Sequence, residues 1–392
     1  MGDIIQLNQA EIKGQLKDLV RGTVEETLNK LLDEEADRIT NAHRYERTEE
    51  RLDTRAGHYS RKLLTTSGEV NLKVPKLRVL PFETAIVERY KRREESVEEA
   101  LIEMYLAGVS VRRVEDVTEA LWGAKVSPAT VSELNKKVYV QIEAWRNREL
   151  KSTYPYVFLD GIYLKKNWGG TIENVAILVA LGVNEDGNRE VIGACEGGKE
   201  DTESWLRFFR HLAKRGLRGV RMMTGDKCNG MVEAMLQVFP EAHYQRCMVH
   251  FMRNVLSDVP RVRAKEVGAM LKAIFAQENK AACLRKAQEV VEHLRRTKLG
   301  SAAKTLEDGI VETLTYTNYP SQHLLRIRNN NGIERINREI RRRTRVVGCF
   351  PDGNSALMLV CARLRHMSAS QWGEKVYLNM QHLCELEKEQ AN

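Results

Sequence analysis

Three β-like segments precede the first helical segment in the middle of the chain, and this order restricts the possible folds more than any other feature. Their apolar and β-branched residues lie at 156–164, 175–183 and 191–195. A turn signal at 184–187 separates the second segment from the third, so an antiparallel meander is expected. Helical spacing follows at 202–214 and 229–238, with short strands at 219–224 and near residue 243. We therefore predict an α/β fold with a mixed sheet, because a doubly wound parallel sheet does not begin with three strands.

The first 150 residues have a different pattern, in which helical segments flank a short β-like stretch. An amphipathic helix is predicted from the spacing of Leu16, Leu19, Val20, Val24, Leu28, Leu31 and Leu32. A hairpin is predicted within residues 61–78. Three helical segments follow, the first two ended by Gly108 and Gly123 and the third begun by Ser127 and Pro128. Short helices with tight turns are typical of a helix-turn-helix, with the third helix as the candidate groove reader, although a bundle without DNA contacts fits equally well.

The last part of the chain is mostly helical. Residues 261–316 keep helical spacing without a strand signal, an arginine-rich helix begins near Gly332, and an apolar helix begins at Ser355. We predict five regions from these changes of pattern. They are an N-terminal helix and hairpin that bind DNA (1–95), a helix-turn-helix-like DNA-binding domain (96–150), the first part of the α/β core (151–260), an all-helical insertion (261–318) and the second part of the core (319–392).

Composition limits the partners and the compartment. Lys and Arg outnumber Asp and Glu by 62 to 54, and the formal charge of +8 favours a polyanion such as nucleic acid. The 7 cysteines show no CxxC spacing, which argues against a disulfide framework and a structural zinc site. The longest apolar run, 175–183, is too short to cross a membrane, and the N-terminus resembles neither a signal peptide nor a myristoylation site. We therefore expect a cytoplasmic protein without a membrane partner.

Three acidic residues occupy positions where an acid needs an explanation. Asp160 follows three apolar residues on a segment that is otherwise typical of a buried strand. A buried carboxylate is costly unless a strong partner such as a divalent cation compensates it. Asp226 follows the strand at 219–224, and Glu334 opens the arginine-rich helix. Carboxylates at the ends of neighbouring strands are able to share hard cations, which prefer oxygen ligands.

Each acid also has a purely structural explanation. Asp160 is part of an Asp-Gly pair, which is common in turns, and Asp226 is placed to cap the following helix. Asn331 and Glu334 have the spacing of a capping box. Both glutamates of the arginine-rich helix are also spaced for ion pairs, Glu334 with Arg338 and Glu339 with Arg343. Helical spacing alone does not separate Glu334 from Glu339.

Four motifs, in this order along the chain, resemble those of the IS256-group transposases, which are relatives of the eukaryotic Mutator-like enzymes. They are LDGIYLKKNWGG around Asp160, TGDKCNGM around Asp226, YQRCMVHFMRN around Cys247 and His250, and NNNGIERINREIRRRTR around Glu334. The resemblance extends from about Arg55 to Trp372. It is specific because the motifs are long and occur in the family's order.

The resemblance implies a ribonuclease H-like catalytic core, interrupted by the all-helical insertion, with DNA-binding elements in front. It implies that Asp160, Asp226 and Glu334 form a DDE triad that binds Mg²⁺, with Mn²⁺ as a substitute. The implied activity is DNA strand cleavage and strand transfer by two-metal phosphoryl transfer at the terminal inverted repeats of an insertion sequence. Two ends must be joined, so a homodimer or a higher homo-oligomer on DNA is expected, in association with the nucleoid.

Cys247 and His250 are three residues apart, which places them on one side of a helix. They supply half of a zinc ligand set, so a packed thiol and a hydrogen-bonded histidine is the simpler explanation. The resemblance implies instead that they support the active site, with His250 near a DNA phosphate.

Several basic side chains near the triad are predicted to contact DNA. The arginine-rich helix contributes Arg335, Arg338, Arg341, Arg342, Arg343 and Arg345. Asn331, Arg246 and Arg253 are further predicted contacts. A charged run of this kind is often only a solvated helix face, but beside a nuclease site it is suited to holding phosphates.

Two other functions remain compatible with the sequence. A ribonuclease H-like nuclease or resolvase would share the three acids but would not transfer strands. An inactive DNA-binding regulator would keep the fold without the chemistry, although the intact acids argue against it.

Overall fold

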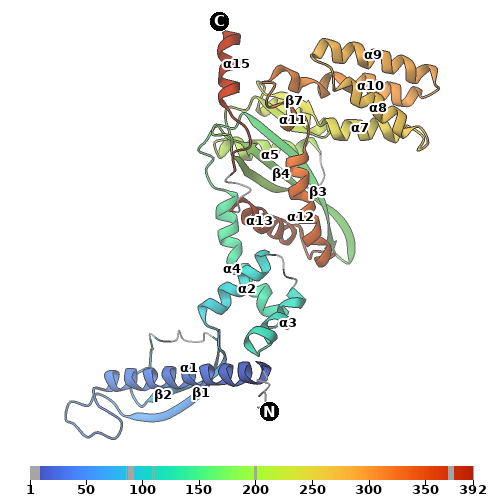
Figure 1. Ribbon diagram of the computed structural model, residues 1–392. Helices are drawn as coiled ribbons and strands as arrows, with labels where there is room; N and C mark the ends of the chain where they lie inside the picture. Colours follow the sequence, from blue (N-terminus) through green and yellow to red (C-terminus); the bar gives the residue numbers. More distant parts are fainter. Residues whose placement is uncertain are drawn as a thin grey trace, which may run out of the picture. The chain divides into compact units, whose positions relative to one another are not determined.

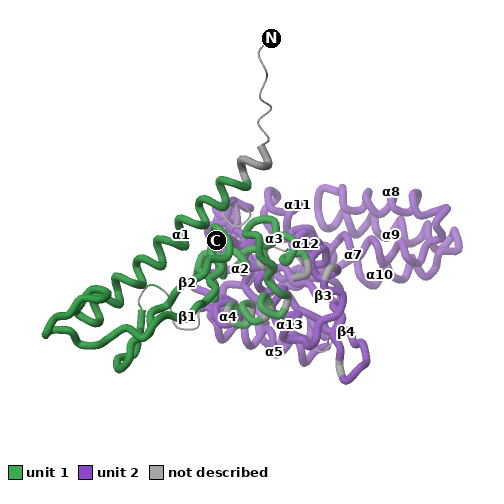
Figure 2. The backbone as a smooth tube through the Cα atoms, turned by 90° about the horizontal axis from the view of Figure 1, so that it is seen from below, with its two compact units in different colours: residues 1–138 green, residues 139–392 purple. Residues whose placement is uncertain are grey.

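The computed structural model describes residues 9–84, 86, 92–107, 109, 111–197, 201–369 and 375–391. Gly108 and Trp372, which entered the sequence predictions, lie outside the described residues. The chain divides into two compact units, Met1–Val138 and Tyr139–Asn392 (Figure 2). None of the helices in the described part of the chain is long and apolar enough to cross a membrane.

The first unit is built from helices and one hairpin (Figure 1). Its elements are α1 (Gln9–Thr40), β1 (Arg55–Thr65), β2 (Gly68–Leu77), α2 (Glu95–Ala107), α3 (Val111–Trp122) and the first part of α4 (Pro128–Arg146). The predicted hairpin is confirmed, because β1 and β2 pair antiparallel up to Thr65 and Gly68. Gly68 has a φ of +120°, a conformation that favours glycine and allows the tight turn.

The long helix α1 buries only part of its apolar stripe. Val24, Leu28 and Leu32 pack with the hairpin core around Val70. Leu16, by contrast, is 58% exposed. The predicted helix is confirmed, and the hairpin covers only the C-terminal part of its apolar stripe.

Helices α2, α3 and α4 form a second core in the same unit. Val97, Leu101, Val114 and Val131 are buried together with Leu64 of β1. Gly123, with a φ of +69°, follows the end of α3. The predicted three helices are confirmed, and their DNA-binding role stays a prediction. Leu64 joins this core to the hairpin, so the helix and hairpin regions pack as one unit.

The second unit contains the predicted α/β segment and the C-terminal helices. Its elements are β3 (Tyr156–Trp168), β4 (Thr171–Val183), β5 (Arg189–Gly197), α5 (Thr202–Lys214), β6 (Met222–Gly225), α6 (Asn229–Val238), β7 (His243–Arg246), α7 (Met248–Ser257), α8 (Ala264–Ile274), α9 (Lys280–Arg296), α10 (Gly300–Thr313), η1 (Thr315–Asn318), α11 (Leu324–Ile327), α12 (Asn331–Val347), α13 (Gly353–Ser368) and α15 (Gln381–Ala391). The predicted mixed α/β fold is confirmed.

The five strands form one mixed sheet with the order β5-β4-β3-β6-β7. β3, β4 and β5 are antiparallel neighbours, which confirms the predicted meander. β6 runs parallel to β3, and β7 runs parallel to β6. β6 starts at Met222 rather than at Gly219, because Gly219 has a φ of +71° that is incompatible with a regular strand.

Helices cover both faces of this sheet. Alternation along β3 directs Leu159 to one face and Phe158 and Asp160 to the other. The face of Leu159 is covered by α5 and α6, whose Trp205 and Met231 belong to the same core. On the other face, α12 and α13 contact β3 (Figure 1). Asp160 therefore points to the side of the sheet that carries α12.

The segment predicted as an all-helical insertion, 261–318, lies within a fully described range and contains α8, α9, α10 and η1 without a strand. α10 packs against α7, α9 and β7, so these helices form a layer beside the β7 edge of the sheet (Figure 1). The sheet face to which Asp160 points is therefore covered by α12 and α13.

Candidate active site

Asp160 lies in the middle of β3 and is held by two hydrogen bonds. The side-chain NH₂ of Asn337, on α12, donates to Asp160 Oδ2 over 2.5 Å, and the Gly161 N–H donates to Oδ1 over 2.9 Å. Burial raises the pKa of the Asp160 carboxyl, and these two donors oppose that rise. Asp160 is thus not a turn residue, since β3 continues to Trp168.

The strand register places Asp226 beside Asp160. The parallel pairing of β3 and β6 ends with Phe158 opposite Thr224, and each aspartate follows two residues later. The Asp226 carboxylate accepts a hydrogen bond from the Lys227 N–H over 2.7 Å and is 48% exposed. The alternative role of Asp226 as a helix cap is wrong, because α6 has Cys228 at its N-cap position.

Glu334 lies in the first turn of α12 and points toward α7. Its Oε1 is 3.0 Å from His250 Nε2 and 3.6 Å from an Arg253 guanidinium nitrogen. The predicted capping box is wrong, because Asn330 is the N-cap residue and Asn331 is already helical. No capping bond therefore competes with this orientation of the Glu334 side chain.

Glu339, the other candidate glutamate, belongs to a different cluster. Its carboxylate pairs with Arg342 at 3.1 Å and with Arg363 of α13 at 3.8 Å. Glu334, in contrast, contacts residues of the β7–α7 segment. The geometry therefore separates two glutamates that helical spacing left equivalent.

The segment before α12 is fixed to three different strands and helices. The buried Asn330 donates from its side chain to the Leu159 carbonyl over 2.8 Å, and its N–H donates to Cys247 Sγ over 3.3 Å. The Thr224 hydroxyl of β6 donates to the Ile327 carbonyl over 3.0 Å. These bonds set where α12 begins, and so they set the position of Glu334 relative to β3, β6 and α7.

His250, on α7, lies between two of the acids. Its Nδ1 is 3.8 Å from Asp226 Oδ2, and its Nε2 contacts Glu334. A side-chain hydrogen bond with Cys247 raises the pKa of the His250 imidazole to about 9, and the carboxylates of Asp226 and Glu334 act in the same direction. The raised pKa favours the cationic form of His250, and this form attracts both carboxylates.

The oxygen atoms at this site fit a hard divalent cation. Asn337 Oδ1 is buried and accepts no hydrogen bond, whereas Glu334 Oε1 lies 3.0 Å from His250 Nε2. Carboxylate and amide oxygens are the ligands that Mg²⁺ prefers. Within the described residues, however, no three His, Cys, Asp or Glu side chains are already grouped as a metal site. The oxygen atoms of the site are therefore suitable ligands for a divalent cation. The His250 imidazole, however, already contacts both Asp226 and Glu334.

The arginine-rich helix α12 has one exposed and one buried side. Ile333, Ile336 and Ile340 are buried, which orients the helix. The exposed polar positions are Asn331, Arg335, Arg338, Arg341, Arg342 and Arg345. Most of them recur every three or four residues, so they form a continuous basic stripe. Arg253 on α7 is also exposed, at 61%.

Two predicted DNA contacts are buried instead. Arg343 is 7% exposed and Arg246 is 5% exposed. The Arg246 guanidinium lies over the Phe251 ring, 4.8 Å from its centre. We therefore withdraw both residues from the predicted phosphate contacts, because a buried guanidinium is not accessible to DNA.

Sequence reasoning missed Asn330 and Asn337. Both are buried, at 0% and 2% exposed, and both donate to β3. The available signal was spacing, since Asn337 follows Glu334 by one helical turn among apolar positions. A buried amide at such a position needs a polar partner, and Asp160 supplies it.

The sequence comparisons establish the family of this chain, and the shared role of the three acids stays a prediction. The chain belongs to the Mutator family of transposases, whose family model matches residues 1–374. It is 40% identical over 344 residues to the transposase of insertion sequence element IS406 from Burkholderia multivorans, covering 86% of this chain and 87% of that one. It is 36% identical over 379 residues to the transposase of ISRM5 from Rhizobium meliloti, covering 95% and 93%. For the transposase of IS256 in transposon Tn4001 from Staphylococcus aureus, the identity is 33% over 376 residues, covering 95% and 96%.

Proposed function

We propose that the protein is an insertion-sequence transposase that cleaves DNA at the terminal inverted repeats of its element and transfers the cut strands to a target. The observation that carries this proposal is that His250 contacts both Asp226 and Glu334, while the β3–β6 register places Asp160 next to Asp226. Carboxylates from three separate segments of the chain suit metal-assisted phosphoryl transfer at a phosphodiester.

The topology of the sheet supports a ribonuclease H-like core. Three antiparallel strands are followed by two parallel ones, and the first acid lies on the central strand, β3. The helical segment 261–318 then separates the β7–α7 region from α12. This order of elements supports the interrupted core that the sequence resemblance implies.

Asp160, Asp226 and Glu334 would hold Mg²⁺, or Mn²⁺ in its place. The bound ions would lower the pKa of the attacking hydroxyl and neutralise charge on the leaving oxygen. Asn337 of α12 and the Gly161 N–H each bind one oxygen of the Asp160 carboxylate, which holds it in one orientation. The positive charge of His250 reduces the repulsion between Asp226 and Glu334.

The exposed arginines of α12 and Arg253 would hold the DNA backbone beside these acids. Charge-assisted hydrogen bonds from guanidinium groups suit phosphate oxygens, and they position DNA without recognising its sequence. Joining two element ends requires two active sites, so we propose that the protein acts as a homodimer or a higher homo-oligomer on DNA.

The test is a cleavage and joining assay with purified full-length protein, labelled duplexes that carry the element ends, and Mg²⁺ or Mn²⁺. Nicks at the ends together with joined products support a transposase. Nicks without joined products would indicate a nuclease or resolvase. End binding with neither product, in any divalent metal, would indicate a DNA-binding regulator.

A further inference from the structure

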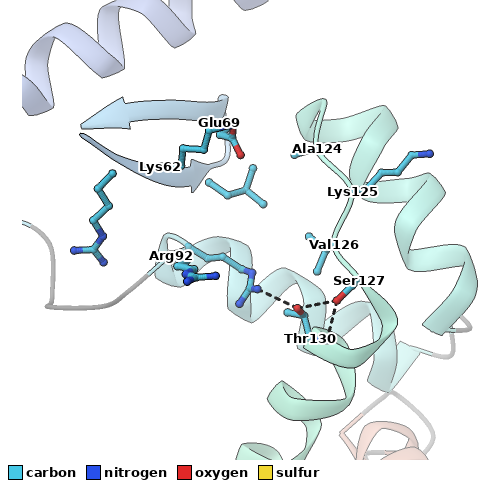
Figure 3. Close-up of a pocket in the computed structure, with 11 residues that line it drawn as sticks. Lys62, Glu69, Arg92, Ala124, Lys125, Val126, Ser127 and Thr130 are labelled. Carbon is cyan, nitrogen blue, oxygen red and sulfur yellow. Dashed lines mark hydrogen bonds and ion pairs between the residues drawn. The ribbon is translucent and has the colours of Figure 1, made fainter. Parts of the chain in front are cut away.

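The first unit contains a cavity of about 830 Å³ between the hairpin and the start of α4 (Figure 3). Five of its described lining residues are basic, namely Arg61, Lys62, Arg92, Arg93 and Lys125. Glu69 is the only acid among the lining residues that the structure describes. The lining therefore carries an excess of positive charge, contributed by the hairpin, the segment before α2 and the loop before α4.

The frame of this cavity is held by backbone hydrogen bonds. The Leu64 N–H donates to the Arg92 carbonyl over 3.0 Å, and the Glu94 N–H donates to the Leu64 carbonyl over 2.8 Å. Leu64 itself is buried in the core of α2, α3 and α4. The basic residues of the hairpin and those before α2 are thereby kept at a fixed spacing.

Three of the basic side chains pair with acids at the surface or over a long distance. Lys62 pairs with Glu69 at 2.6 Å, and the two side chains are 71% and 44% exposed. Lys125 pairs with Glu119 at 3.5 Å, and these side chains are 64% and 55% exposed. Arg93 lies 3.9 Å from Glu98 and donates to the Thr130 hydroxyl over 3.1 Å, which directs its guanidinium toward the start of α4. Exposed ion pairs contribute little to stability, so a phosphate is able to compete for Lys62 and Lys125.

The lining also indicates which part of a nucleic acid it contacts. None of the described lining residues is aromatic, so the cavity offers no platform on which unpaired bases stack. The start of α4 is already capped, because Ser127 Oγ accepts the Thr130 N–H over 3.3 Å. The basic side chains, rather than the end of the helix, are therefore the groups available to an anion.

We propose that this cavity binds the phosphodiester backbone of duplex DNA. The hairpin and the loop before α4 then contact one strand together, and the start of α4 lies against the backbone instead of entering a groove. This inference rests on the proposed function, because it takes the DNA substrate from there. It gives the hairpin a direct role in DNA binding.

The test uses the full-length variant Lys62→Gln/Arg92→Gln, in which both altered side chains are exposed. Binding to an element-end duplex and to a random duplex is measured by fluorescence anisotropy over a range of salt concentrations. Each lost duplex phosphate contact lowers the log-log salt slope by about 0.9. We expect both affinities to fall by roughly ten-fold at low salt and the slope to flatten by about 1.8 for two contacts. The matched control is Lys30→Gln/Arg38→Gln, which removes the same charge from exposed positions of α1, in the same unit but outside the cavity, and should keep the slope.

A third variant, Glu69→Gln, gives an effect of opposite sign. It removes the acid that competes for Lys62, so DNA should bind more tightly. An unchanged slope in the double variant, or a loss restricted to the end duplex, overturns the phosphate-binding role.

The proposed function is tested separately by cleavage of end DNA. If the protein cleaves and joins DNA but the double variant behaves as wild type, only the role of the cavity fails. If the slope changes as expected but no metal supports cleavage, the cavity stands and the transposase chemistry fails.

Discussion

The candidate active site and the basic cavity are built in different ways. The site joins elements that are far apart in sequence through buried polar groups, and Asn330 and Asn337 are 0% and 2% exposed. In the cavity, backbone hydrogen bonds fix the frame, whereas the charged groups, such as Lys62 at 71% exposed, remain in solvent.

This difference follows from the two tasks. Phosphoryl transfer needs carboxylate oxygens in defined positions, and Asn337 and His250 restrain Asp160 and Glu334 respectively. Holding a DNA backbone needs positive charge near a surface, and exposed side chains adapt to the phosphate they meet. Substitutions of the acids should therefore act in an all-or-none manner, while substitutions on the basic surfaces should act in proportion to the charge removed.

The largest effect is expected for the acids themselves. Asp160→Asn, Asp226→Asn and Glu334→Gln each remove a charge that metal binding needs, while the shape of the side chain is kept. DNA cleavage should fall by about a thousand-fold or more in each variant. End binding and the thermal unfolding midpoint should stay close to wild type. A variant with near-normal cleavage would remove that residue from the triad.

An intermediate effect is expected for Asn337→Leu, which keeps the volume but removes the donor to Asp160. Loss of a residue that orients a metal ligand typically reduces activity by about 10–100-fold. The Mg²⁺ concentration for half-maximal cleavage should rise, and DNA affinity should not change. Asn174→Leu, the same change at an exposed position of β4, is the control. A loss of cleavage without a change in the Mg²⁺ requirement would contradict the positioning role.

The sequence predicted the succession of strands along the chain because each strand signal is local. The three acids were selected by the resemblance of their motifs, and their shared role stays a prediction. Three strand patterns in succession, with an acid inside the first, have few alternative explanations. The half-exposed stripe of α1 was not predictable, since apolar spacing indicates a face but not how far the partner hairpin extends. The burial of Arg343 was not predictable either, because its neighbours Arg341, Arg342 and Arg345 are exposed. What distinguishes Arg343 is the orientation of α12, which the buried Ile333, Ile336 and Ile340 determine.

A smaller, graded effect is expected on the exposed side of α12. Replacing Arg338, Arg342 and Arg345 by Gln should weaken binding to end and random duplexes alike. The salt slope should flatten by about 0.9 for each phosphate contact that is lost. The single variant Arg343→Gln should instead lower the unfolding midpoint and leave the slope unchanged, because this side chain is buried. An unchanged slope in the triple variant would make the stripe only a solvated face.

The smallest effect is expected for Glu339→Gln, which has the same chemistry as Glu334→Gln on the same helix. Glu339 pairs with Arg342, which is 74% exposed, and such a surface pair contributes about 0–1 kcal/mol. The substitution adds net positive charge beside the basic stripe, so DNA binding should stay equal or become slightly tighter, and the cleavage rate should remain within about two-fold of wild type. The comparison with Glu334→Gln is made in one assay at saturating DNA, so that a difference in affinity does not appear as a difference in rate. If cleavage is lost in the Glu339 variant and kept in the Glu334 variant, Glu339 and not Glu334 is the third acid of the triad. The contacts between His250 and Glu334 would then have only a structural role.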